Sequence, residues 1–179
     1  MPGPVLIVTD VQEGFTRVGN LASPECTAAI PRVVGIVREE MYAGTPVIFT
    51  RDSHVEDDLE FNVFPRHCVV GTDEHQLVRE LLPFEADATA VIDKRRYSAF
   101  FDTDASEVLE RLAPDEVHII GFCTDICVLH TTSDLRNRDY NVVVRRDACE
   151  TFDAPGHPHR DVNEWAFDHM EHVLGARVI

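Results

Sequence analysis

Long apolar runs are missing from this sequence. Its hydrophobic stretches are short, as in residues 5–8 (VLIV) and 118–122 (HIIGF), whereas a helix that crosses a membrane needs about 20 apolar residues. The N-terminus, MPGPVLIVTD, also lacks the basic segment and the cleavage site of an export signal. We therefore expect a cytoplasmic protein with no membrane partner.

Positive charge is scarce as well. The chain has 16 lysines and arginines against 32 aspartates and glutamates, which gives a formal net charge of −16. Such a charge repels the phosphates of nucleic acids and anionic lipids, so a nucleic-acid partner is excluded and a neutral or cationic small molecule is favoured. An acidic surface can also serve solubility alone, so the charge by itself identifies no substrate.

Cysteine is infrequent, and its number is odd. An odd count without an export signal is typical of a reducing compartment, where structural disulfides are not expected. At least one thiol then calls for an explanation by chemistry or by simple burial. The five cysteines are Cys26, Cys68, Cys123, Cys127 and Cys149.

The pattern of strands and helices indicates an α/β protein. The 179 residues contain no repeat and no linker, so we expect a single domain over residues 1–179. Helical patterns separate the strands, and Pro31 is expected at the start of one helix rather than inside it. This alternation predicts an open, mainly parallel sheet with helices on both faces. The apolar, strand-like runs are residues 4–10, 45–52, 88–94, 116–121, 140–147 and 176–179.

Four reactive side chains follow predicted strands. Asp10, Asp52 and Lys94 each stand at the end of such a run, and Cys127 lies just past the end of a fourth. Ligands of open α/β sheets bind outside the carboxyl ends of the strands. We therefore expect these four groups to gather at one edge of the sheet.

Cys127 is the candidate nucleophile. The segment GFCTDICVLHT reads as strand, tight turn and helix, and amides at a helix N-terminus stabilise a thiolate or a substrate oxyanion. Asp10 could accept the thiol proton, while Lys94 would lower the pKa of the thiol. Three alternatives stay open: a merely buried Cys127, a redox pair with Cys123, and His130 as the base.

A second group of residues has the chemistry of a metal site. Asp52 and His54 are two residues apart, so their side chains point the same way on an extended segment. His67 follows after a loop that can fold back, and Glu60 could ligate directly or through water. One carboxylate and two imidazoles suit Zn²⁺, Fe²⁺ or Mn²⁺ with open positions. The alternative is a polar loop with solvated histidines.

These segments resemble the nicotinamidase branch of the isochorismatase-like cysteine hydrolases. The resemblance runs through LIVTDVQEGF, TRDSH, FPRHCVVGT, DKRRYSAFFDT and GFCTDICVLHT. It implies a six-stranded, mainly parallel fold and a cis peptide at Phe122–Cys123 that would aim backbone amides at the substrate carbonyl. The site residues that it implies are a triad of Asp10, Lys94 and Cys127, metal ligands Asp52, His54, His67 and Glu60, and aromatic pocket positions Phe15, Phe64 and Tyr97.

The resemblance also implies a reaction, namely deamidation of nicotinamide to nicotinate and ammonia through a cysteine thioester, as in NAD salvage. A divalent metal, in the first place Zn²⁺, would anchor the pyridine ring, and a homo-oligomer is expected. The sequence departs from its relatives at Phe122 and Cys123, where they usually carry small aliphatic residues. The alternative is another hydrolase of this fold that acts on a carbamoyl or biuret-like amide.

Overall fold

The computed structural model describes residues 3–179 and contains one six-stranded sheet. The strand order is β3-β2-β1-β4-β5-β6, and every pairing is parallel. This confirms the predicted fold class, although residues 1 and 2 of the predicted domain lie outside the described range. The strands are β1 (Pro4–Thr9), β2 (Val47–Asp52), β3 (Ala90–Lys94), β4 (Glu116–Phe122), β5 (Val142–Glu150) and β6 (Arg177–Val178).

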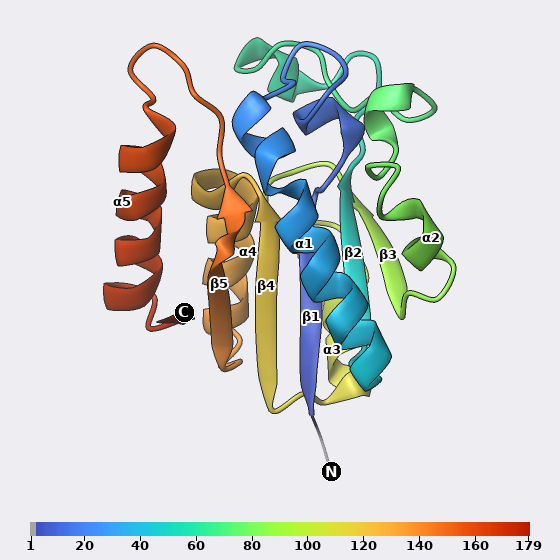
Figure 1. The fold of residues 1–179 in the computed structure, drawn as a ribbon, viewed down its shortest axis with the longest axis vertical. Coiled ribbons are helices and arrows are strands. Elements are labelled where there is room, and N and C mark those ends of the chain that lie inside the picture. The colour runs from blue at the N-terminus through green and yellow to red at the C-terminus, as the bar shows by residue number, and fades with distance from the viewer. Residues whose placement is uncertain (1–2) are drawn as a thin grey trace.

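Helices cover both faces of the sheet (Figure 1). Because successive side chains of a strand point to opposite faces, Val5 and Ile7 of β1 pack in one core while Leu6 and Val8 pack in the other. The first core also takes residues of α3, α4 and α5, and the second takes residues of α1. The helices are α1 (Pro24–Ala43), α2 (Leu82–Glu85), α3 (Ala105–Leu112), α4 (Leu129–Arg136) and α5 (His159–His172).

The expected start of the first helix at Pro31 was wrong. Helix α1 begins at Pro24, where the Ser23 hydroxyl accepts a hydrogen bond from the backbone N–H of Cys26. Pro31 lies inside the 20-residue helix. A proline there removes one backbone hydrogen bond, but the buried face of α1 against the sheet outweighs that loss.

The carboxyl ends of the strands lie at the edge of the sheet that faces the top of Figure 1. Asp52 and Lys94 are direct neighbours in the register of β2 and β3. Gly121 of β4 has a φ of +118°, and a Cβ there would lie 2.1 Å from the carbonyl oxygen of Thr9. The missing side chain therefore lets β4 pair closely with β1 just before the Cys127 turn. Across residues 3–179, none of the helices has the length and apolar character that a bilayer crossing requires.

Candidate active site

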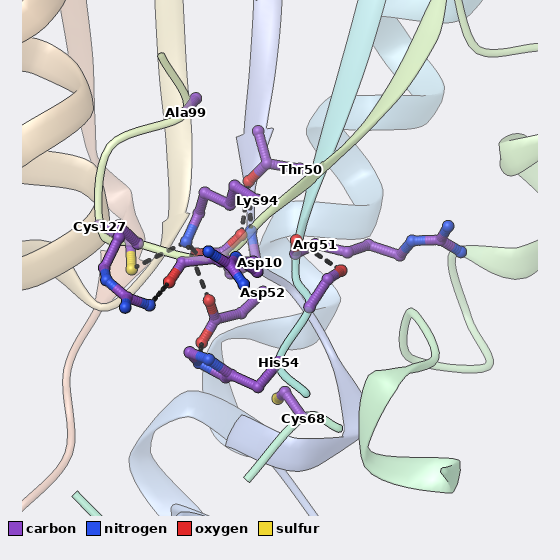
Figure 2. Close-up of polar contacts among 12 residues, drawn as sticks. Asp10, Thr50, Arg51, Asp52, His54, Cys68, Lys94, Ala99 and Cys127 are labelled. Atoms are coloured by element: carbon purple, nitrogen blue, oxygen red, sulfur yellow. Dashed lines mark hydrogen bonds and ion pairs between the residues drawn. The ribbon is translucent and has the colours of Figure 1, made fainter. Parts of the chain in front are cut away.

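Three predicted residues meet at the carboxyl edge of the sheet (Figure 2). The Lys94 ammonium lies 2.7 Å from Oδ2 of Asp10 and 3.5 Å from Sγ of Cys127. Lys94 therefore contacts both the Asp10 carboxylate and the Cys127 sulfur. The Asp10 and Lys94 side chains have no exposed surface. An acid, an amine and a sulfur from three distant segments therefore form one buried cluster.

Burial sets the charge state of this cluster. It raises the pKa of the Cys127 thiol well above its ordinary value, although the Lys94 charge opposes the rise. Burial also raises the pKa of Asp10, with Lys94 opposing it and Asp52 adding to it. For Lys94, burial is outweighed by Asp10 and Asp52, which raise its pKa. The expected lowering effect of Lys94 on the Cys127 pKa is present, but burial outweighs it, so the structure favours a neutral thiol beside a basic carboxylate.

Thr50 is a residue that the sequence analysis missed. Its hydroxyl donates a hydrogen bond of 2.6 Å to Oδ1 of Asp10 and accepts one of 3.2 Å from the Asp10 backbone N–H. This leaves Oδ2 of Asp10 facing Lys94. Only the pairing of β1 with β2 brings Thr50 next to Asp10, so no sequence motif indicates the contact.

We expect Thr50→Val to lower kcat about tenfold, the scale of a hydrogen bond to a charged group. The Thr50 hydroxyl lowers the Asp10 pKa, so its loss raises that pKa and moves the acid limb of the pH–kcat profile to higher pH. Thr50→Ser keeps the hydroxyl and serves as the control. An acid limb at the same pH in all three proteins would show that Thr50 does not position Asp10.

Cys127 lies in a wide helical turn, Thr124–Val128, that leads into α4. The Phe122–Cys123 peptide is cis, as the resemblance implied. Phe122 packs in the apolar core that α1 covers, whereas Cys123 lines the pocket. The bulky Phe122 side chain therefore does not narrow the pocket.

Two alternatives, a redox pair of Cys123 with Cys127 and His130 as the base, find less support. All five cysteines are free thiols, and Cys123 packs with Cys26 in the core that α1 covers. His130 is exposed, and its Nδ1 donates a 2.7 Å hydrogen bond to the Ile126 carbonyl oxygen. Asp10 and Cys127 share the Lys94 ammonium, whereas His130 lies next to Tyr97 with ring centres 5.2 Å apart.

The four predicted metal-binding residues also meet. Asp52, His54, Glu60 and His67 are buried, and one possible ligand atom from each lies within 4.8 Å of the others. Oδ2 of Asp52 is 3.0 Å from Nε2 of His54 and 3.2 Å from Nε2 of His67. Oε2 of Glu60 is buried and has no hydrogen-bond partner.

The surroundings of this cluster fit a cation. Nδ1 of His67 donates to the Pro65 carbonyl oxygen at 2.7 Å, and Nδ1 of His54 lies 3.2 Å from Oδ2 of Asp58. A neutral imidazole that donates through Nδ1 presents a lone pair at Nε2. Both histidines would then aim lone pairs at the Asp52 carboxylate, and a divalent cation relieves that repulsion.

Gln12 fixes the backbone at Asp52. Its Oε1 accepts from the Asp52 N–H at 2.6 Å, and its Nε2 donates to the Asp52 and His75 carbonyl oxygens at 3.0 and 2.9 Å. Gln12 and Asp58 were both missed by the sequence analysis. Their contacts join residues across loops, and nothing in the local sequence pattern indicates them.

A mainly apolar pocket opens onto Cys127 and the Asp52 cluster. The three predicted aromatic residues line it, together with Phe152, which the sequence analysis missed. Phe152 follows β5, and no motif marks it. The lining residues are Phe15, Leu21, Ser23, Cys26, Asp52, Glu60, Phe64, His67, Tyr97, Cys123, Ile126, Cys127 and Phe152.

Comparisons with known proteins identify the family and the fold. A family model described as "Isochorismatase domain" matches residues 4–177. The chain is similar to a nicotinamidase from Bacillus subtilis, with 31% identity, 98% of each chain covered and a TM-score of 0.86. It is similar to an N-carbamoylsarcosine amidase from Thermoplasma acidophilum, with 31% identity, 98% and 95% covered, and a TM-score of 0.85. A pyrazinamidase of Pyrococcus horikoshii in complex with zinc has 30% identity, 99% of each chain covered and a TM-score of 0.87.

Proposed function

This chain belongs to the isochorismatase family, and from that premise we propose that it deamidates nicotinamide to nicotinate and ammonia. The observation that carries the proposal is the contact of Lys94 with both Asp10 and Cys127, because Cys127 also lines an aromatic pocket. A neutral, flat amide fits the mainly apolar lining. The similar nicotinamidase from Bacillus subtilis supports the choice of substrate.

We propose that acylation begins with proton transfer from the Cys127 thiol to Asp10. The raised Asp10 pKa favours this transfer, and Lys94 stabilises the thiolate as sulfur attacks the amide carbon. Backbone amides of Cys123 and Cys127 would bind the oxyanion. Asp10 then returns its proton to the departing nitrogen, the C–N bond breaks, and a thioester and ammonia result.

Deacylation uses the same residues in reverse. Asp10 accepts a proton from water as the water oxygen attacks the thioester carbon. The C–S bond breaks, nicotinate leaves, and the proton returns to the Cys127 sulfur. One carboxylate therefore serves both half-reactions, which its burial beside Lys94 allows.

Asp52, His54, Glu60 and His67 would hold a divalent cation, with zinc proposed first because a similar pyrazinamidase contains it. When bound, the cation offers an open position to the pyridine nitrogen and so anchors the ring. Phe15, Phe64 and Tyr97 would contact the ring faces and edge.

Removal of the metal is expected to weaken nicotinamide binding by about tenfold or more, which corresponds to about 1.4 kcal/mol or more. The dissociation constant is measured by calorimetry in Cys127→Ala, where the amide is not consumed. Zinc added back should restore the affinity. An unchanged affinity in fully stripped protein would remove the metal from ring binding.

The proposed substrate is tested by ammonia release from a panel of amides. Nicotinamide is expected to give the highest kcat/KM, because only an aromatic ring uses both the aromatic lining and the metal. The second candidate is a carbamoyl amide, which the similar N-carbamoylsarcosine amidase favours. Faster release from N-carbamoylsarcosine or biuret than from nicotinamide would decide for that candidate.

A further inference from the structure

The loop between β5 and α5 supplies one wall of the pocket. Phe152 lines the pocket, and its ring stacks on His157 with centres 4.2 Å apart and planes 4° apart. Ala154 and His157 bond to each other through their backbone N–H and C=O groups at 3.0 and 2.8 Å. His157 thus covers one face of the Phe152 ring.

Both ring nitrogens of His157 face oxygen acceptors. Nδ1 is 2.9 Å from the Phe152 carbonyl oxygen, and Nε2 is 3.0 Å from Oδ2 of Asp125. A neutral imidazole has one N–H and can serve only one of them. An imidazolium serves both, and its charge also favours stacking on the Phe152 ring.

Asp125 connects this loop to the nucleophile. It lies in the Thr124–Val128 turn, two residues before Cys127. Its second oxygen, Oδ1, accepts a hydrogen bond of 2.6 Å from the Thr151 hydroxyl. The carboxylate therefore joins the turn that carries the thiol to both ends of the loop that carries Phe152.

We propose that His157 is a positioning residue whose imidazolium ties the Phe152 wall to the Cys127 turn, so that substrate binding weakens when His157 loses its proton. This inference rests on the proposed function for its substrate. The loss of one N–H releases either Asp125 or the Phe152 carbonyl. The wall then moves more freely, and KM rises while the triad stays intact.

The charged surroundings favour the imidazolium. Burial would lower the pKa of His157, but hydrogen bonds to Asp125 and to the Phe152 carbonyl outweigh it and raise that pKa. Two further charged groups beside the loop contact His159 instead: Glu150 of β5 lies 3.3 Å from His159 Nδ1, and Asp153 accepts from the His159 N–H at 3.0 Å. KM should therefore be low at acid pH and rise as the pH passes above the ordinary histidine range.

The test compares pH profiles of KM and kcat for nicotinamide. In the wild type we expect KM to rise about tenfold across the His157 titration. His157→Gln should have the high KM at every pH and a kcat within about twofold of the wild type. His172→Gln, an exposed change, should match the wild type. A His157→Gln KM that equals the wild-type value at acid pH, or that keeps the pH-dependent rise, would overturn the proposal.

A second variant and a second readout separate this proposal from the proposed function. Asp125→Asn removes the charge that raises the His157 pKa, so the rise in KM should move to lower pH. Hydrogen exchange of residues 151–158 needs no substrate. The protection of these amides, relative to their intrinsic exchange rate at each pH, should fall above the His157 pKa in the wild type. In His157→Gln the protection should be low at every pH. If nicotinamide is not hydrolysed but the protection of residues 151–158 still depends on His157 and on pH, only the proposed function fails. Equal protection in the wild type and in His157→Gln refutes the role of His157.

Discussion

Cys127→Ala is expected to lower kcat for nicotinamide by a factor of about 10⁵, because the covalent route disappears with the sulfur. Nicotinamide binding should survive, since the ring contacts belong to Phe15, Phe64, Tyr97 and the metal ligands. Ammonia release measures the first effect, and calorimetry measures the second. The variant removes a buried side chain, so circular dichroism should accompany both.

Cys149→Ala is the matched control for this change. Cys149 is another buried free thiol, but it lies on β5, with its Sγ 3.9 Å from the Ile119 carbonyl oxygen, and it does not line the pocket. Its replacement should leave kcat unchanged. If Cys127→Ala deamidated nicotinamide at the wild-type rate, Cys127 would not be the nucleophile.

Asp10→Asn is expected to lower kcat about 10³-fold or more, because the buried proton acceptor is lost while the shape is kept. The backbone φ of Asp10 is +50°, a conformation that asparagine also tolerates, so the fold should hold. The Cys127 thiol should at the same time become more acidic. Burial, Asp10 and Asp52 raise the Cys127 pKa and Lys94 lowers it, so the variant loses one of the influences that oppose Lys94.

These two effects have opposite signs and can be measured on one sample. Alkylation of Cys127 by iodoacetamide at neutral pH should become faster in Asp10→Asn, because a larger share of the thiol is ionised, while ammonia release collapses. Asp147→Asn, a change in an exposed ion pair with Arg32, should alter neither rate. Slower alkylation together with lost activity would indicate a damaged pocket rather than a missing base.

The meeting of the candidate site residues could be predicted because it follows from the direction of the strands. Asp10, Asp52 and Lys94 end β1, β2 and β3, and parallel strands bring their carboxyl ends to one edge. The sequence therefore predicted the meeting of these residues with Cys127. The cis peptide at Phe122–Cys123 was implied by resemblance alone, and the structure contains it.

Contacts that depend on register and on loops could not be predicted. Thr50 contacts Asp10 because β1 pairs with β2. Gln12 accepts a hydrogen bond from the Asp52 backbone N–H across a turn that no sequence pattern indicates. The protonation states of the buried groups could not be predicted from the sequence either. Burial raises the Cys127 pKa by more than Lys94 lowers it, and that burial depends on the whole fold. The contact of His157 with Asp125 depends on the whole fold as well.

The thioester on Cys127 is tested most directly by trapping with hydroxylamine. The acyl group of a thioester partitions between water and hydroxylamine after ammonia has left. We expect the ratio of nicotinohydroxamate to nicotinate to rise linearly with hydroxylamine, and ammonia release to keep its rate wherever acylation limits turnover. Nicotinate as the sole product at every hydroxylamine concentration would contradict a thioester and, with it, the role of Cys127, Asp10 and Lys94 as one catalytic unit.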